Sequence, residues 1–258
     1  MSAFKFKKSL GQHFLKNQTI LKKICLIRNL SNETILEIGP GMGFLTERIL
    51  DCDPKKIFAI EKDISLKEHL EKIKQKHPKK LKLIYGDILK IDLRNIASEK
   101  IILVANLPYN IASTLVINWL RNLEIFKSVI IMVQKEVAER FTAKVRSKQY
   151  GRISVLIQVF CDVEKKFDVS PENFFPKPKI ESSVIEIIPK QNINIDYEKL
   201  DKLLKLSFLH RRKTIKNNFK KKKLETIDFS SKFGLEENLR PQEIPPEIYL
   251  KLSKLLFS

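Results

Sequence analysis

Short apolar runs alternate with amphipathic segments over the first half of the chain. Strands are expected at the apolar runs 34–38, 56–60, 81–85, 101–105 and 128–133. Helices are expected where apolar residues recur at helical spacing, at 17–30, 44–50, 64–74 and 111–120. Strands that are apolar throughout and alternate with helices are typical of a parallel sheet covered on both faces. The pattern therefore predicts an α/β fold.

The pattern changes after Gln134. Helices are expected at 134–142 and 153–159, and strands at 164–169 and 183–188. The prolines of the segment 171–178 predict an extended loop between these two strands. Beyond Pro189 only helical patterns remain, at 197–209, 214–222 and 247–256. We therefore expect an α/β domain over 1–189 and a small all-helical domain over 190–258.

The composition adds a large positive charge to a chain that can bury a core. Of 258 residues, 43% are hydrophobic, and 49 Lys and Arg against 30 Asp and Glu leave a formal charge of +19. Three cysteines, an odd number spread along the chain, exclude a disulfide scaffold. No apolar stretch approaches the roughly 18 residues of a membrane span, and no secretory signal is visible. We expect a cytoplasmic protein that binds a polyanion and no membrane.

Basic residues gather in two segments that contain no acid. Seven bases precede Glu33, and eight of the thirteen residues from Arg211 to Lys223 are basic. Solvated surfaces are the plain alternative. Arginine forks beside hydroxyl and amide side chains, however, suit phosphate and sugar oxygens better than lysines alone. Nucleic-acid contacts are therefore predicted for Arg211, Arg212, Lys213 and Lys216.

Three of the seven glycines fall within Gly39–Gly43, between a predicted strand and a predicted helix. Glycine lets the backbone turn tightly and approach a ligand, and the N-terminus of the following helix adds N–H donors. A plain strand-to-helix turn is the structural alternative. The spacing G-x-G-x-G differs from the dinucleotide fingerprint G-x-G-x-x-G, which argues against a pyrophosphate ligand.

Two acidic residues end the next two strands. Glu61 closes the run 56–60, and Asp87 follows the run 81–85. A carboxylate at such a strand end can accept hydrogen bonds from both ribose hydroxyls of a nucleoside-containing cofactor. A solvated acid beside Lys62 is the alternative for Glu61. With the glycine loop, these acids predict one cofactor crevice at the edge of the sheet, where open α/β sheets bind ligands.

The segment Asn106-Leu107-Pro108-Tyr109 closes the fourth strand at the same edge. The Asn106 side-chain carbonyl and the Leu107 backbone carbonyl can accept both N–H groups of an exocyclic amine and stabilise positive charge as that amine attacks. Pro108 fixes the turn that aims them, and Tyr109 offers a face on which a base can stack. An Asn-capped turn with a buried Tyr is the alternative. Phe174 is a candidate second aromatic wall, although an aromatic beside prolines is more often part of a core.

Other classes of catalytic site lack support in the sequence. The four histidines show no metal-ligand spacing and no paired Cys/His pattern is present, so no metal is expected. The sequence contains neither a G-x-S-x-G elbow nor a G-x-x-x-x-G-K-[ST] loop, which disfavours serine hydrolases and P-loop NTPases.

With these motifs, the sequence resembles the small-subunit (16S) ribosomal RNA adenine N6,N6-dimethyltransferases, a family of class I S-adenosylmethionine-dependent enzymes. The resemblance extends over nearly the whole chain. Its most specific parts are Gly-Gln-His-Phe-Leu at 11–15 and Arg-Arg-Lys-Thr at 211–214. It also includes the segments 37–43, 106–111, 134–138, 150–155 and 174–184. Phe175 and Lys177 depart from the small or proline residues expected at their positions.

The resemblance implies a Rossmann-like, mostly parallel sheet, with S-adenosylmethionine as the methyl donor. It implies dimethylation of two adjacent adenines near the 3′ end of 16S rRNA in the pre-30S subunit, with a role in ribosome biogenesis, by a protein that acts as a monomer. The implied cofactor contacts are His13, Leu15, Gly39, Glu61, Asp87 and Asn106. The implied catalytic residues are Asn106, Leu107 and Tyr109, which would present the target adenine, with Phe174 on its other face and Pro108 fixing the turn.

Three alternatives stay open at this point. A large-subunit rRNA adenine methylase of the macrolide-resistance type shares the fold and a similar tetrapeptide, although the segments 134–138 and 211–214 argue against it. A non-catalytic nucleic-acid-binding assembly factor would not require the 106–109 segment. A dinucleotide-dependent oxidoreductase is disfavoured by the glycine spacing.

Overall fold

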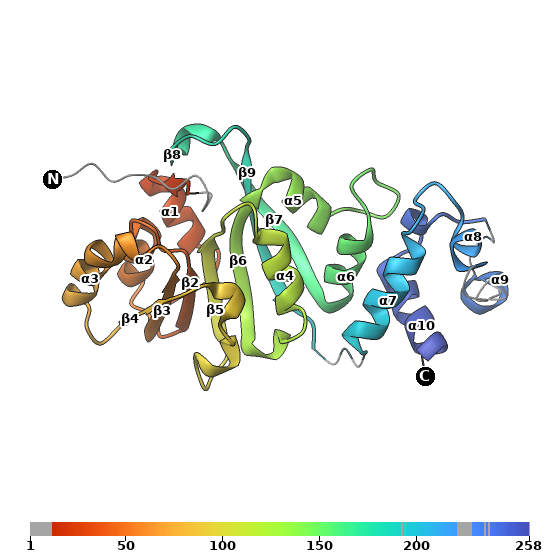
Figure 1. Cartoon of the computed structure of the whole chain (residues 1–258), viewed down its shortest axis with the longest axis horizontal. Coiled ribbons are helices and arrows are strands. Elements are labelled where there is room, and N and C mark those ends of the chain that lie inside the picture. The colour runs from red at the N-terminus through yellow and green to blue at the C-terminus, as the bar shows by residue number, and fades with distance from the viewer. Residues whose placement is uncertain are drawn as a thin grey trace. The chain divides into compact units, whose positions relative to one another are not determined.

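The computed structural model describes residues 12–191, 193, 195–220, 229–234, 236 and 238–257. The chain divides into two compact units, coloured along the sequence in Figure 1. The first contains Met1–Ala138 and Glu164–Pro189, and the second contains Glu139–Val163 and Lys190–Ser258. The segment 139–163 thus belongs to the second unit. The predicted domains, 1–189 and 190–258, are continuous and place this segment in the first. The separate functions of the two predicted domains stay a prediction.

One sheet carries the α/β fold, and seven strands of the described residues form it in the order β4-β3-β2-β5-β6-β9-β7. The strands are β2 Thr34–Ile38, β3 Lys56–Glu61, β4 Leu81–Tyr85, β5 Ile101–Asn106, β6 Phe126–Gln134, β7 Cys161–Val169 and β9 Ser182–Pro189. The strands from β4 to β6 pair in parallel, and β9 pairs antiparallel with β6. The predicted mostly parallel sheet is confirmed.

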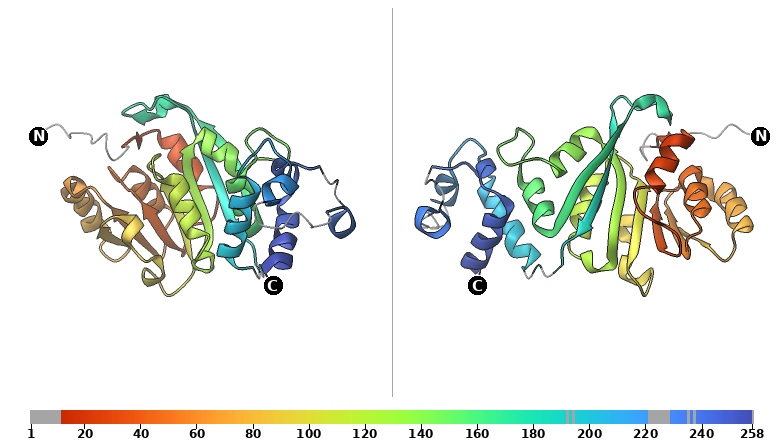
Figure 2. Two further views of the ribbon diagram at one scale, coloured as in Figure 1. Left: turned by 45° about the vertical axis from the view of Figure 1, so that its right-hand side comes forward. Right: turned by 180° about the vertical axis from the view of Figure 1, so that it is seen from behind.

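Helices cover both faces of this sheet, which is why its central strands are apolar throughout. They are α1 Gln18–Cys25, α2 Phe44–Asp51, α3 Lys67–Lys76 and α4 Ala112–Trp119. Figure 1 shows α4 in front of the sheet, and the rear view of Figure 2 shows α1 and α2 on the opposite face. Asn17 caps α1, since its side chain accepts from the N–H groups of Thr19 and Ile20. This helix ends at Cys25, earlier than the predicted 30.

A two-stranded sheet that the sequence pattern does not predict lies beside the main one. Strand β1, Phe14–Leu15, pairs antiparallel with β8, Phe174–Phe175. Strands of two residues carry no periodicity, so only the contact itself reveals them. The pairing brings the N-terminal segment against the proline-containing loop, although these segments are far apart in the sequence (Figure 1).

The second unit is mainly helical. Its helices include α6 Arg152–Phe160, α7 Tyr197–Ser207, α8 Ile215–Phe219, α9 Phe229–Phe233 and α10 Pro246–Phe257, and α5 Lys135–Phe141 begins in the first unit. Leu203, Phe219 and Tyr249 are fully buried in its core. The sequence does not predict α9, and part of the predicted helix 214–222 lies outside the described residues. Within the described part of the chain, no helix is long and apolar enough to span a membrane.

A buried ionic cluster ties the loop after α1 to the sheet of the first unit. Glu186 on β9 is only 5% exposed and pairs with Arg28 and with Lys166, whose Nζ lies 3.0 Å away. Ser128 on β6 donates a third hydrogen bond to it, at 3.0 Å. Burial alone would raise the pKa of Glu186, but these donors outweigh it and hold that pKa below its ordinary value.

Glu186→Gln is expected to lower the free energy of unfolding by about 2–3 kcal/mol at neutral pH, because Arg28 and Lys166 lose their buried counter-charge. Urea denaturation measures this change. Because the pKa is depressed in the folded protein, the contribution is present above the unfolded value of 4.5 and disappears as the pH falls through the folded value. Glu164 also pairs with Lys166 but is 71% exposed, so Glu164→Gln should cost less than about 0.5 kcal/mol. Equal losses in the two variants would contradict the cluster's importance.

Candidate active site

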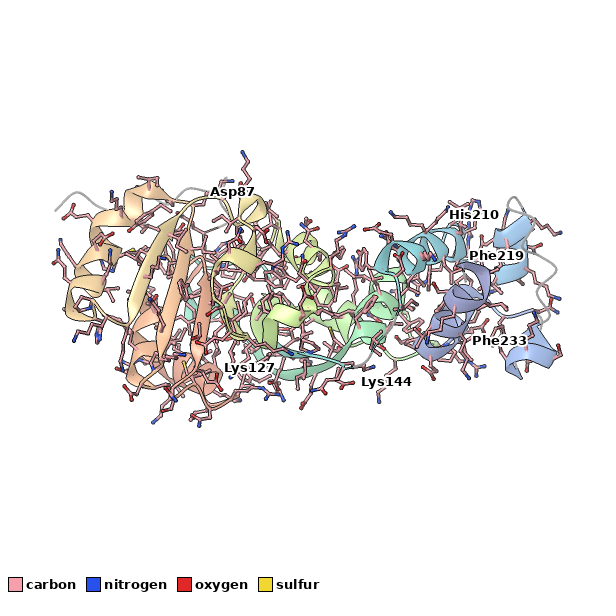
Figure 3. The ribbon with its side chains drawn as sticks, turned by 90° about the horizontal axis from the view of Figure 1, so that it is seen from below. Asp87, Lys127, Lys144, His210, Phe219 and Phe233 are labelled. Atoms are coloured by element: carbon pink, nitrogen blue, oxygen red, sulfur yellow. The ribbon has the colours of Figure 1, made fainter. Side chains whose placement is uncertain are left out.

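Four predicted site positions meet at the carboxyl ends of neighbouring strands. Because the strand order is β4-β3-β2-β5, Asp87, Glu61, Gly39 and Asn106 follow one another along one edge of the sheet. The N–H of Gly39 donates to the Ile60 carbonyl at 2.9 Å, which continues the strand pairing into the glycine loop. Asp87, labelled in Figure 3, follows Gly86 after β4 and caps the short 3-10 helix Ile88–Lys90. The predicted crevice edge is present in the fold.

A single cleft collects most of the predicted residues. It holds about 930 Å³ of space, part of which is open to solvent. The predicted residues that line it are His13, Gly39, Glu61, Asp87, Asn106, Leu107, Pro108 and Tyr109. The structure therefore brings together the N-terminal segment, the glycine loop, both acids and the tetrapeptide.

The glycine loop is in the backbone conformation that the motif suggested. Gly39, Gly41 and Gly43 have φ values of 67°, 60° and 75°, which L-residues rarely adopt. A Cβ on Gly41 would lie 2.4 Å from the ring of Phe14, so β1 packs directly on the loop. A Cβ on Gly39 would meet no atom within 4 Å, because this glycine borders open cleft. Gly39 thus leaves space for a ligand beside the backbone.

The two strand-end acids have different environments. Glu61 is 7% exposed, and its two oxygens accept from the N–H groups of Asp63 at 2.7 Å and Gly41 at 3.1 Å. The alternative of a solvated acid is therefore wrong for Glu61. Burial raises its pKa and these hydrogen bonds offset part of the rise. Asp87 instead accepts from Lys62 at 2.9 Å, and this bond lowers the pKa of Asp87.

Glu37, at the end of β2, is a third acid beside the glycine loop. It is 1% exposed, and the hydroxyl of Thr46 donates a hydrogen bond to its carboxyl group at 2.6 Å. Burial raises the pKa of Glu37 to about 8, so its carboxyl group is protonated at neutral pH. It lines a smaller pocket next to the main cleft, together with Leu15, Gly39 and Asn106.

The side chain of Asn106 has a defined orientation. Its Nδ2 donates to the backbone carbonyl of His13 at 2.9 Å. A carbonyl can only accept, so Nδ2 must face it and Oδ1 is the end that remains for another donor. The N–H of Leu107 donates to the Met132 carbonyl at 3.1 Å and ties the segment to β6. The amide therefore presents an acceptor from a residue that lines the cleft.

Tyr109 is held from two sides. Its ring stacks on the ring of His13, with centroids 5.5 Å apart and planes at 23°. Its hydroxyl bonds to Oγ of Ser182, at 2.7 Å, and Ser182 is fully buried at the start of β9. Burial raises the pKa of Tyr109, and the bond to Ser182 lowers it in part. His13 is itself anchored, because its Nδ1 lies 2.8 Å from the Pro176 carbonyl and must be protonated to bond there.

Two predicted residues lie outside the main cleft. Phe174 is 4% exposed, belongs to the hydrophobic core and pairs with Leu15 across the two-stranded sheet. Leu15 lines only the smaller pocket. The structure does not bring Phe174 to the cleft; its contact with a base stays a prediction. This loop and the start of β9 contribute Pro176 and Ser182 instead, through a backbone carbonyl and a small hydroxyl that leave no pattern in the sequence.

The predicted nucleic-acid residues lie in the second unit. Arg211, Arg212 and Lys213 are exposed between α7 and α8, and Lys216 is on α8. Arg211 uses part of its guanidinium within the protein, because Nη2 donates to the Lys148 carbonyl at 2.5 Å. Among the described residues, no group of three His, Cys, Asp or Glu could hold a metal.

Comparison with known proteins shows that the whole chain, including the segments that line the cleft, is similar to one family. The family model described as "Ribosomal RNA adenine dimethylase" matches residues 3–257. The chain is 40% identical to "Ribosomal RNA small subunit methyltransferase A" of Pelagibacter ubique, over 97% of this chain and 96% of that protein. It is 42% identical to the protein of the same description from Ehrlichia ruminantium, over 92% of each chain.

Two solved structures share the fold. A dimethyladenosine transferase from Plasmodium falciparum superimposes with a TM-score of 0.81 at 27% identity, over 92% of this chain and 95% of that one. The 23S rRNA methyltransferase ErmE superimposes with a TM-score of 0.74 at 22% identity, over 95% of this chain and all of that one. The identity to ErmE is low enough that only the fold follows from it.

Glu37→Gln is expected to remove a pH dependence of stability. The folded pKa of about 8 exceeds the unfolded 4.5, so the folded wild type holds an extra proton between these values. Its free energy of unfolding should fall by about 1.4 kcal/mol per pH unit across that window relative to the variant. Urea denaturation of both proteins from pH 5 to pH 9 measures the difference. Parallel stability curves would show that Glu37 is ionised in the folded protein.

Ser182→Ala is expected to raise the pKa of Tyr109 further, because the phenolate loses its hydrogen-bond donor. Spectrophotometric titration of tyrosine absorbance measures this shift, with Tyr109→Phe identifying the transition that belongs to Tyr109. Ser183 is also fully buried but donates to Asp168 at 2.6 Å, so Ser183→Ala is the matched control. An unchanged Tyr109 transition in Ser182→Ala would show that this bond is not formed.

Proposed function

The chain belongs to the ribosomal RNA adenine dimethylase family, and from that premise we propose that it dimethylates N6 of two adjacent adenines near the 3′ end of 16S rRNA. The methyl donor is S-adenosylmethionine. The protein is a methyltransferase with a role in small-subunit ribosome biogenesis. The observation that carries this proposal is the Asn106 amide, whose oxygen is left as an acceptor in a cleft that also holds the glycine loop and both strand-end acids.

The residues of the cleft fit the cofactor. S-adenosylmethionine, when bound, supplies a methyl group on a sulfonium centre whose leaving thioether is neutral. Gly39 offers room for its methionine part, because a Cβ there would meet nothing within 4 Å. The carboxylate of Glu61 has four lone-pair sites, more than the backbone N–H groups that it accepts, and so keeps acceptor capacity for a ribose hydroxyl. Asp87 would accept a hydrogen bond from the adenine amino group of the cofactor, and His13 would approach it from the N-terminal segment. Leu15 lines the smaller pocket beside the cleft and would contact the cofactor from there.

The substrate adenine is recognised through its amino group. Its nitrogen is a poor nucleophile because the lone pair is delocalised into the ring. Acceptors on the Asn106 side chain and the Leu107 backbone draw both N–H groups away from the ring plane and stabilise the positive charge that develops on nitrogen. The amine that has one methyl group still has one N–H for an acceptor, so the same site serves the second transfer.

The aromatic ring of Tyr109 is the stacking surface for this adenine. A base within structured RNA must leave its stack to reach such a cleft, which costs a few kcal/mol. The stacked His13 ring and the Ser182 hydroxyl fix the ring of Tyr109 before the base arrives. Preorganisation of this kind removes the entropy of ordering from the binding step. Phe174 would have to leave the core to cover the other face of the base.

The basic second unit binds the phosphates of the RNA. Arg211, Arg212, Lys213 and Lys216 supply charge there, and such contacts make binding strongly dependent on salt. We also propose that the protein acts as a monomer on the assembling small subunit in the cytoplasm. The ratio of Lys and Arg to Asp and Glu, 49 to 30, suits a polyanionic partner.

The remaining alternatives differ in measurable ways. A large-subunit methylase would label isolated 50S rather than 30S particles. A non-catalytic assembly factor would bind small-subunit RNA but would not bind S-adenosylmethionine in a calorimeter. Incubation of the protein with labelled S-adenosylmethionine and unmodified small subunits, followed by nucleoside analysis for dimethyladenosine, tests the proposal directly.

Asn106→Ala is expected to reduce methyl incorporation into small subunits at least 100-fold, by roughly the loss seen when one preorganised transition-state contact is removed. Affinity for RNA should stay within about twofold, because no basic residue is altered. Asn118 is an exposed amide on α4 outside the main cleft, so Asn118→Ala should retain full activity. Full turnover by Asn106→Ala would refute the assignment.

A further inference from the structure

The guanidinium of Arg211 contacts the backbone of a second basic loop, the one between α5 and α6. Its Nη2 donates to the carbonyl of Lys148 at 2.5 Å and lies 3.5 Å from that of Ser147, and both belong to the loop between α5 and α6. Figure 1 shows this loop beside the connection from α7 to α8. Both contacts are made by the same nitrogen, Nη2, at the end of the rigid planar guanidinium, and a lysine ammonium on its flexible stem does not place a donor in the same geometry.

Both sides of this contact are fixed to the second unit. In the α5–α6 loop, the Arg146 N–H donates to the Gln242 carbonyl at 2.9 Å, and the hydroxyl of the fully buried Tyr150 donates to Ile244 at 2.9 Å. On the other side, the buried Asn218 donates to the carbonyls of Ser207 and His210, at 2.8 and 3.2 Å. Arg211 therefore joins two preordered segments.

The joined segments carry exposed positive charge without neighbouring acids in sequence. No Asp or Glu occurs in 140–161 or in 202–224. Arg146 and Lys148 are exposed, as are Arg212 and Lys213, and none of these four forms an ion pair with another described residue. We define the basic surface as Arg146, Lys148, Arg211, Arg212 and Lys213.

One lysine of the same loop lies elsewhere. Lys144 is exposed but lines a groove with Gln158 and Lys190, and Figure 3 shows it well separated from His210, which immediately precedes Arg211. Lys144 thus differs from Lys148 in position but not in charge. It is a natural control for the basic surface.

We propose that Arg146 and Lys148 bind RNA phosphates, and that Arg211 acts as a positioning residue that holds their loop beside Arg212 and Lys213. This rests on the proposed function, since rRNA is the partner. A rigid array of guanidinium and ammonium groups suits the spaced charges of an RNA backbone, and its preorganisation lowers the cost of binding. The nucleic-acid site is therefore larger than the segment 211–216, and Arg211 supports it in part through a neighbouring loop.

The test measures the affinity of the full chain for a 16S rRNA fragment over a KCl series. Arg146→Ala with Lys148→Ala should reduce the slope of log affinity against log salt by about 1.4–1.8, which corresponds to two lost phosphate contacts. Lys144→Ala should leave the slope and the affinity nearly unchanged. An unchanged slope in the double variant would overturn the proposal and favour an acidic protein as the partner of this surface.

Arg211→Lys keeps the positive charge but removes the guanidinium. It therefore distinguishes a role in positioning the α5–α6 loop from a direct contact between Arg211 and RNA. It should weaken RNA binding about fivefold in the wild-type background, the effect of losing roughly one hydrogen bond. In the variant that already carries Arg146→Ala and Lys148→Ala, Arg211→Lys should not weaken RNA binding further, because the loop that Arg211 positions no longer binds RNA. If the loss of RNA affinity from Arg211→Lys were the same in both backgrounds, Arg211 would contact RNA independently of the loop. That result would overturn its proposed positioning role.

Two further measurements distinguish a failure of this inference from loss of folding and from failure of the proposed function. Thermal unfolding identifies a variant that no longer folds, and in that case the salt slope of the loop double variant decides alone. Methylation of small subunits by the wild type tests the proposed function. If the wild type produces dimethyladenosine while the double variant keeps its slope, only the present inference fails; if the wild type produces none, the proposed function fails.

Discussion

The hydrogen bond from Asn106 Nδ2 to the His13 carbonyl determines what the cleft can do. An asparagine amide has a donor end and an acceptor end of nearly equal size, and only its partner decides which end faces a ligand. By taking the donor end, His13 leaves Oδ1 for an amino group. The same residue stacks on Tyr109 and is anchored to Pro176, so one short segment orders both the acceptor and the stacking surface. The chemistry of the cleft therefore depends on β1 being in place.

The scaffold makes that arrangement precise over long sequence distances. Asn106 comes from the end of β5 and His13 from the start of the described chain, and they meet because β1 pairs with β8. The rigid element beneath them is the sheet, whose parallel strands deliver the glycine loop, both acids and the tetrapeptide to one edge in the order of the strands. Phe14 packs on Gly41 and closes the contact between the N-terminal segment and that edge.

The sequence predicts what local patterns can encode. Each strand of β2 to β6 has an apolar run, and the residues that follow these runs lie together because parallel strands end at one edge, so Gly39, Glu61, Asp87 and Asn106 could be grouped without a structure. The positions of Phe174 and Ser182 could not. Whether an aromatic beside prolines faces a ligand or the core depends on the pairing of two-residue strands, and a serine that bonds to a distant tyrosine has no signal of its own. The contact from Arg211 to the Lys148 carbonyl is hidden for the same reason, since its acceptor is a main-chain atom.

The two units also differ in how their interactions respond to salt. The acceptors of Asn106 and Leu107 and the ring of Tyr109 are neutral and act over hydrogen-bond distances, so dissolved ions screen them little. In the proposed function, the exposed cations of the second unit would act on RNA through interactions that weaken beyond the Debye length of about 8 Å at physiological ionic strength. Raising the ionic strength should therefore weaken capture of the RNA without altering the transfer step once the adenine is bound. Separate placement of charge and chemistry allows the affinity for a large polyanion to change while the geometry that selects an amino group stays fixed.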